Sequence, residues 1–257
     1  HGLSRAPPTG EALVREKVNI NFYIEGGRSR TGKLMPPRVG MLAFLLQAVE
    51  EGAVEDMTFV PCFIGYDQIP EERSYLRELA GRDKQAESFL SVIRARQILK
   101  RSFGKVYVRF DEPVSFRAFC ENPAVAVNPT QMSLKENRKL VHDFAYYLMY
   151  GIVRAGVVTP IDLAAAGLVC MKTHRVGREL FFKSVGYFST MLKKGGFEFA
   201  ESLASQDVAL EQALGLFRYR GFVNLEPSSA PEDEIVYVID EQKRANLEFY
   251  RNSLVNY

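Results

Sequence analysis

Hydrophobic and polar positions in the first half of the chain follow two periods, one typical of strands and one typical of helices. Val18–Ile24 alternates in a β-prone manner, and residues 57–66 and 103–110 are further strand-like runs, the former hydrophobic nearly throughout. Between them, residues 39–51 carry apolar side chains at helical spacing, with Gly52 as a stop. Pro61 inside the second run indicates an edge or a bulge. Strands alternating with helices predict an α/β fold with a partly parallel sheet flanked by helices.

Helical periodicity dominates the second half. Asn-Pro steps near residues 121–135 mark loops, so we expect a boundary near residue 130, between an α/β part (1–130) and a helix-rich part (131–257) with a small β-hairpin. Helices are predicted at 136–153, 160–171, 176–194, 212–220 and 241–257, and the hairpin pairs 221–225 with 234–240. Shorter or charged helical segments are predicted at 11–17, 71–99 and 115–119.

Composition narrows the function classes only modestly. The chain has 257 residues, 47% of them hydrophobic, and a net charge of +2, so bulk basicity does not favour nucleic acid. Its three cysteines are isolated, and neither cysteines nor histidines form a metal-binding motif, so we expect reduced thiols and no metal. The longest apolar runs fall short of the roughly 20 residues of a membrane span. Because the sequence lacks an initial Met, we expect a piece of a longer chain.

One stretch combines the groups that bind oxyanions. After the expected strand at 18–24 come Glu25, Gly26, Gly27, Arg28, Ser29, Arg30 and, three residues on, Lys33. Arginine forks, a lysine charge, a hydroxyl and glycine-exposed amides suit a phosphate or carboxylate. Ligands of open α/β sheets bind at the carboxyl ends of strands, where this loop is expected to lie.

The same loop has two other interpretations. It satisfies the G-x-x-x-x-G-K pattern of a nucleotide P-loop, but Leu34 replaces the Mg²⁺-binding hydroxyl and Pro36-Pro37 prevents an immediate helix. A solvated basic turn is the plainer alternative. For Glu25 we expect a salt bridge that orients Arg28 or Arg30 rather than a catalytic role.

At these residues the sequence resembles the glycerol-3-phosphate and dihydroxyacetone-phosphate acyltransferases. Phe22–Lys33 is similar to their third motif block and Val60–Asp67 to their fourth, with its strand proline. Ordered similarity continues at 75–88 and 103–113, and a looser one at Phe249-Tyr250-Arg251-Asn252. The resemblance implies an acyltransferase-like core, with Arg28 and Arg30 as phosphate ligands. It also implies support from Ser29, Gly26 and Gly27, a weaker role for Lys33, and a site lined by Pro61, Gly65 and Tyr66.

The resemblance also implies a His-x4-Asp pair upstream of the loop, and this chain lacks it. Five positions after His1, His142 and His174 stand Ala6, Tyr147 and Glu179, and the last pair lies downstream of the loop, in the wrong order. His142 lies among apolar positions, which predicts packing. We therefore expect no catalytic residue in this chain, and no activity from it alone.

The function implied by the resemblance is acyl transfer from acyl-CoA or acyl-carrier protein to glycerol 3-phosphate, with no cofactor and peripheral binding to the cytosolic face of a membrane. Dihydroxyacetone phosphate is the rival acceptor, since both carry the phosphate. A non-enzymatic interaction or nucleic-acid-binding module is the alternative of another class, because residues 216–240 could form a winged helix. Its acidic, Pro-rich hairpin loop argues against nucleic acid.

Overall fold

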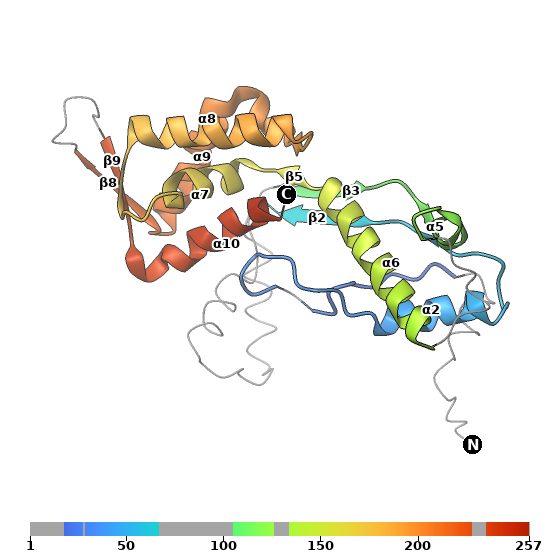
Figure 1. Ribbon diagram of the computed structural model, residues 1–257. Coiled ribbons are helices and arrows are strands. Elements are labelled where there is room, and N and C mark those ends of the chain that lie inside the picture. Colours follow the sequence, from blue (N-terminus) through green and yellow to red (C-terminus); the bar gives the residue numbers. More distant parts are fainter. Residues whose placement is uncertain (1–17, 28, 67–104, 126–133, 228–234, 257) are drawn as a thin grey trace, which may run out of the picture. The chain divides into compact units, whose positions relative to one another are not determined.

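The computed structural model describes residues 18–27, 29–66, 105–125, 134–227 and 235–256 (Figure 1). The chain divides into two compact units. Unit 1 comprises His1–Arg28, Met35–Phe63 and Arg109–Ala155, and unit 2 comprises Ser29–Leu34, Ile64–Val108 and Gly156–Tyr257. The helices predicted at 11–17 and 71–99 lie outside the described residues. The boundary near residue 130 was predicted between an acyltransferase-like core and a helix-rich part, and it stays a prediction.

Unit 1 is built around an aromatic cluster. Helix α2 (Gly40–Glu50) is followed by its cap residue Glu51 and then by Gly52, the predicted stop, whose φ of +73° suits glycine. Strand β1 (Thr58–Phe59) pairs antiparallel with β4 (Val114–Ser115), which leads into α5 (Phe116–Glu121). In the long helix α6 (Leu134–Arg154), the Phe144 ring lies 4.8–5.2 Å from those of Phe59, Phe116 and Phe119. Aromatic contacts therefore hold α6 against β1 and α5.

The first two predicted strands needed correction. Residues 18–23 are not a strand: they run without regular structure into a turn that begins at Ile24. An alternating pattern forms a strand only where another strand offers its hydrogen bonds, and none of the described strands pairs with this segment. The run at 57–66 is two strands, β1 and β2 (Cys62–Tyr66), separated at Val60-Pro61 because proline cannot donate to a ladder.

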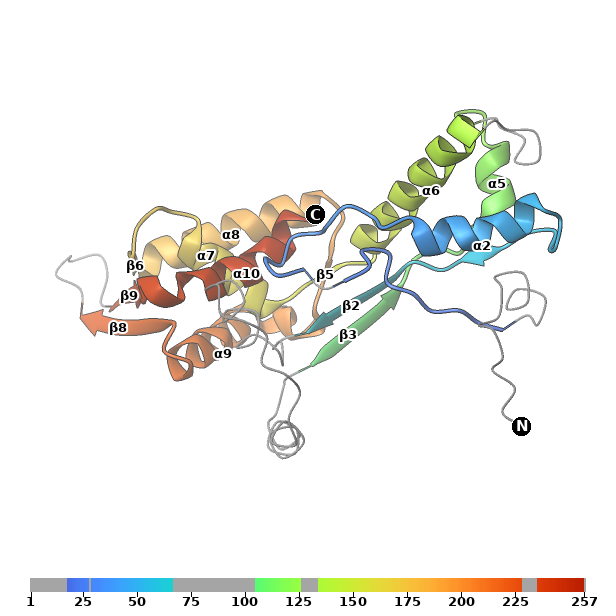
Figure 2. The ribbon, with the colours of Figure 1, turned by 90° about the horizontal axis from the view of Figure 1, so that it is seen from below.

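Strand β2 pairs with β3 (Val106–Phe110), and their arrows run in opposite directions in Figure 2. Apolar side chains stay exposed at alternate positions of this strand pair, namely Ile64, Tyr66, Val106, Val108 and Phe110. The nearly continuous apolar run at 57–66 is typical of a strand buried on both faces, but β2 is not buried in this way.

Unit 2 has a fully buried helix at its centre. Every residue of α7 (Pro160–Val169) is buried, and the helix packs against α8 (Arg178–Lys194), α9 (Gln206–Tyr219) and α10 (Arg244–Val255). Its start is fixed by Pro160 at the first turn and by Thr159, whose hydroxyl accepts the N–H of Asp162. A helix that is apolar all round is stable only when other elements surround it.

A three-stranded sheet closes one end of unit 2. Its order is β6 (Arg175–Gly177), β9 (Ile235–Ile239) and β8 (Val223–Pro227), with β9 antiparallel to both neighbours. The predicted hairpin is confirmed in β8 and β9, whereas β6 was predicted as part of a helix. In chain order α9 precedes the hairpin, which is the helix-then-hairpin order predicted for residues 216–240.

The remaining elements of unit 2 are short. Strands β5 (Val157–Val158) and β7 (Glu198–Phe199) form a parallel pair, and 3₁₀ turns cover η2 (Glu201–Ser205) and η3 (Glu241–Lys243). The fold is thus mixed α/β with small sheets, one of them parallel, while the acyltransferase-like layout of the core stays a prediction. No helix within the described ranges is long and apolar enough to cross a membrane.

Candidate phosphate-binding loop

The base of the loop is closed by three hydrogen bonds within unit 1. The N–H of Gly26 donates to the carbonyl of Tyr23 at 2.9 Å, and the N–H of Arg38 donates to the carbonyl of Ile24 at 2.7 Å. The carboxylate of Glu25 accepts the N–H of Met35 at 2.8 Å. Gly26 has φ +65°, a conformation that residues with a Cβ rarely adopt. The turn therefore requires glycine at this position.

Glu25 thus has a backbone partner that sequence reasoning missed. It joins the two arms of the loop at their base, a role compatible with the structural rather than catalytic part predicted for it. The expected salt bridge to Arg28 lies outside the described residues, as does Arg28 itself.

The tip of the loop is held within unit 2 by Asn252 of α10 and by Asn256, the C-cap residue of that helix. The side-chain amide of Asn252 donates to the carbonyl of Thr31 at 2.7 Å, and that of Asn256 donates to the carbonyl of Gly32 at 3.1 Å. The side-chain oxygen of Asn256 also accepts the N–H of Leu34 at 2.9 Å. Three backbone groups of the tip are satisfied by side chains more than 200 residues away in sequence. Only the looser similarity at residues 249–252 pointed toward this contact.

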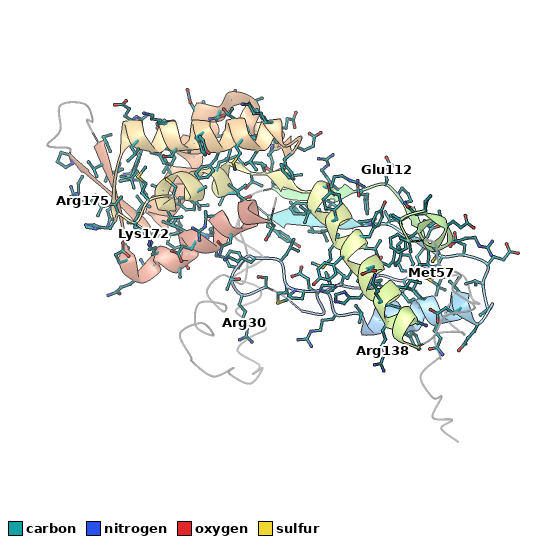
Figure 3. All side chains as sticks on the ribbon, viewed as in Figure 1. Arg30, Met57, Glu112, Arg138, Lys172 and Arg175 are labelled. Atoms are coloured by element: carbon teal, nitrogen blue, oxygen red, sulfur yellow. The ribbon has the colours of Figure 1, made fainter. Side chains whose placement is uncertain are left out.

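Ser29, Arg30 and Lys33 supply the tip's polar side chains. Arg30 and Lys33 are exposed, and Figure 3 shows the Arg30 side chain extending from the loop. The hydroxyl oxygen of Ser29 is buried and has no hydrogen-bond partner within the part of the chain that the structure describes. A buried hydroxyl normally finds a partner. Cations beside such a hydroxyl are groups that an oxyanion could satisfy.

Pro61 is a buried residue of unit 1 with a clear structural task. Its carbonyl accepts the N–H of Asp111 at 2.9 Å, and its ring lies against Gly151 of α6, where an added Cβ would come within 2.8 Å of the proline. The other two residues predicted to line the site belong to β2 in unit 2: Gly65 is half-buried and Tyr66 is exposed.

Asp111 carries an ion pair that sequence reasoning did not find. Its two carboxylate oxygens accept from Nε and a terminal nitrogen of Arg154 at 3.0 and 2.5 Å. This bond is the main reason that the pKa of Arg154 is raised above its ordinary value. The pair links the residue after β3 to the last residue of α6. Asp111 lies in Phe110-Asp111-Glu112-Pro113, one of the stretches that resemble the acyltransferases.

Neither described histidine lies in a setting that points to catalysis. His174 is exposed beside β6, and its carbonyl accepts the N–H of Ile239 at 2.7 Å. The His142 ring is also exposed and rests 4.8 Å from that of Tyr146. The packing predicted for His142 was wrong, because the apolar residues around it face the core while His142 lies on the outer face of α6.

Comparison with known proteins identifies the family. Residues 75–257 match the model of the glycerol-3-phosphate acyltransferase C-terminal region. The chain therefore belongs to the glycerol-3-phosphate acyltransferase family, as the motifs predicted.

Several curated bacterial relatives match almost the whole chain. The glycerol-3-phosphate acyltransferase of Alteromonas mediterranea is 30% identical over 253 residues, and that of Pseudoalteromonas atlantica is 29% identical over 255 residues. Each alignment covers 96% of this chain but 30% of the relative. The chain thus spans less than a third of the length of these relatives.

Proposed function

We propose that this chain is the acceptor-binding and C-terminal part of an enzyme that transfers an acyl group from acyl-CoA or acyl-carrier protein to the 1-hydroxyl of glycerol 3-phosphate. The observation that carries the proposal is the loop at residues 25–33. Hydrogen bonds fix its base and its tip, and its polar side chains have the chemistry of a phosphate ligand set. It lies in a chain of the family whose curated members are named for this activity.

Each polar group of the loop has a proposed task. Arg30 contacts the phosphate through its planar fork, which matches two phosphate oxygens, and Lys33 adds a weaker point charge. The hydroxyl of Ser29 and the backbone N–H of Gly27 donate the remaining hydrogen bonds. Gly26, whose N–H is bonded to the Tyr23 carbonyl, supports the site by shaping the turn. Arg28 has the same task as Arg30 on sequence grounds alone. Pro61, Gly65 and Tyr66 are proposed to line the acceptor site.

The bond-making step requires a base that we place upstream of this chain, in a His-x4-Asp pair. The base takes the proton of the acceptor hydroxyl as its oxygen attacks the thioester carbonyl, and the proton then goes to the thiolate that leaves. The reaction balances without a cofactor. We expect the isolated chain to show no turnover in an assay with glycerol 3-phosphate and acyl-CoA. Robust turnover would contradict this division of labour.

Neither alternative has an observation in its favour. Dihydroxyacetone phosphate presents the same phosphate, so the loop treats both acceptors alike. For nucleic acid, α9 exposes both signs of charge, Asp207 and Glu211 together with Arg218. Glu211 is already paired with Arg178 at 2.7 Å, so α9 offers phosphate no uniformly basic face. Peripheral binding to a membrane is supported by exposed side chains at helical spacing along α8, namely Lys183, Tyr187, Met191 and Lys194. The cytosolic face is proposed from the resemblance alone.

Replacing Arg30 with Ala in the full-length enzyme tests the proposal. Loss of one charged hydrogen-bonding partner should cost about 1.5–3 kcal/mol, which raises KM for glycerol 3-phosphate roughly ten- to a hundredfold. Arg30→Lys keeps the charge but not the fork and should fall between. Arg138→Ala, at an exposed arginine of α6 labelled in Figure 3, is the matched control and should leave KM unchanged. An unchanged KM in Arg30→Ala would count against the phosphate assignment.

A further inference from the structure

The C-terminal helix α10 is firmly built into unit 2. Leu247, Tyr250 and Leu254 share one side of the helix and are buried, and α10 packs extensively against α7. The hydroxyl of Ser253 donates to the carboxylate of Asp162 at the start of α7, at 2.6 Å. A guanidinium nitrogen of Arg220 donates to the Tyr250 hydroxyl at 3.1 Å. Because α10 is fixed in this way, side chains on its neighbouring face have a fixed position relative to the core of unit 2.

That neighbouring face carries Asn252 and Asn256, one helical turn apart. Both contact the loop through its backbone, and the amide of Asn256 bonds to two residues of the tip at once, through donor and acceptor. The oxygen of Asn252 also accepts Nε of Arg251 at 3.1 Å, which fixes the orientation of the amide. Only 6% of Asn252 is exposed, so its bond to Thr31 is shielded from water.

Gly32 provides an independent sign that the two segments are fitted to each other. Its φ is +79°, and a Cβ at this position would collide with the backbone carbonyl of Phe249 in α10. Backbone thus meets backbone at a distance that only glycine allows. The tip's conformation is set by α10 as much as by its own sequence.

The loop has no ladder or helix of its own to fix its shape, since residues 29–38 are turn and irregular structure. Binding groups on such a segment contribute fully only when they are held in place before the ligand arrives. Arg30 directly precedes Thr31 and Gly32, whose carbonyls accept hydrogen bonds from the two asparagines. Lys33 lies between Gly32 and Leu34, which are both bonded to Asn256. We propose that Asn252 and Asn256 are positioning residues for the phosphate-binding loop, and that α10 thereby sets the affinity for the phosphorylated acceptor.

This inference rests on the proposed function, because it takes the loop to be the phosphate ligand. It assigns α10 a part in substrate binding. Neither asparagine touches the acceptor in this account. Both act through the backbone of the loop.

The test uses the full-length enzyme carrying Asn252→Ala or Asn256→Ala. We expect each variant to raise KM for glycerol 3-phosphate about five- to tenfold, since a buried hydrogen bond or two is lost, and to leave kcat at saturating acceptor within about twofold. KM for the acyl donor should not change. Asn256→Asp keeps the acceptor for Leu34 but loses the donor to Gly32, and adds a negative charge near the loop. Its KM for the phosphorylated acceptor should rise at least as much as that of Asn256→Ala.

Asn246→Ala is the matched control, because Asn246 is a buried asparagine of the same helix whose side-chain oxygen has no hydrogen-bond partner among the described residues. It perturbs the packing of α10 and should leave KM for glycerol 3-phosphate unchanged. Amide exchange gives a second readout. The N–H of Leu34 should exchange faster in Asn256→Ala but not in Asn246→Ala, since only the first removes its acceptor.

The outcomes separate the two proposals. If Arg30→Ala raises KM and the asparagine variants do not, the phosphate assignment stands and the positioning role is overturned. If the asparagine variants raise KM and Arg30→Ala does not, α10 positions the loop but the phosphate contact belongs to another loop residue. If Asn246→Ala raises KM as much as the other two, the effect is general packing and the positioning role is also overturned.

Discussion

Helix α7 and the β2–β3 strand pair are both rich in apolar residues, yet only the helix is covered. All of α7 is buried among α8, α9 and α10, whereas the strand pair exposes 67% of Phe110 and about half of Val106 and Val108. The difference shows that an apolar sequence does not by itself predict burial. An apolar segment is buried only where other elements of the structure pack against it.

The largest predicted effect contrasts Phe181, which packs over Gly167 of α7, with Phe110 of the strand pair. Phe181 of α8 is fully buried and packs edge-on against Tyr237, at 5.3 Å between ring centroids. Phe181→Ala should lower the free energy of unfolding by about 3–5 kcal/mol in urea denaturation. Phe110→Ala in the same chain should change it by no more than about 0.5 kcal/mol. Equal costs would mean that the strand pair is covered after all, and would break the comparison.

A smaller effect is expected where the strand pair is held by charge instead of apolar contact. Arg154→Met removes the partner of the Asp111 carboxylate, whose side chain is 10% exposed while that of Arg154 is 50% exposed. Since solvent screens the exposed guanidinium, we expect a loss of about 1 kcal/mol in unfolding free energy. In a double-mutant cycle with Asp111→Asn, additive losses would show that the two residues do not interact.

The smallest effect concerns the acid sensitivity of the β1–β4 pair. Burial pushes the pKa of Asp56 upward, but hydrogen bonds from the Ser115 hydroxyl and the Arg117 N–H outweigh it, so the pKa lies below its ordinary value. A carboxyl with a lowered pKa in the folded state stabilises the fold above its unfolded pKa, and this contribution is lost as pH falls through the folded value. Asp56→Asn should therefore lower Tm at pH 7 and make little difference near pH 3. A deficit that is equal at both values would contradict the assignment.

The helices were predictable because each carries its own evidence. The apolar spacing of residues 39–51 and Gly52 fixed α2 within a residue or two, and the long periodic runs gave α6 and α8. Strands were less predictable, because their existence depends on a partner. Residues 18–24 have the alternating pattern of a strand, but none of the described strands pairs with them. Strand β6 pairs with β9 but is only three residues long, too short for an alternating pattern to be recognised.

The chemistry of the candidate site was predictable from the sequence, but the hydrogen bonds that hold the loop in place were not. Glycines, hydroxyls and cations in one short stretch identify a loop that could hold an oxyanion, and Gly26 does occupy a turn that requires glycine. Nothing local could show that Glu25 closes its base or that Asn256 grips its tip. Those bonds depend on how distant segments fold together, and an isolated asparagine near the end of a helix gives no sequence signal.

Amide hydrogen exchange in the full-length enzyme tests the central claim most directly. With glycerol 3-phosphate present, the backbone amides of residues 25–34 should exchange more slowly, because the phosphate occupies and fixes the loop. Glycerol at the same concentration lacks the phosphate and should leave these amides unchanged. Unchanged exchange in this loop at saturating glycerol 3-phosphate, or equal slowing by glycerol, would contradict the account.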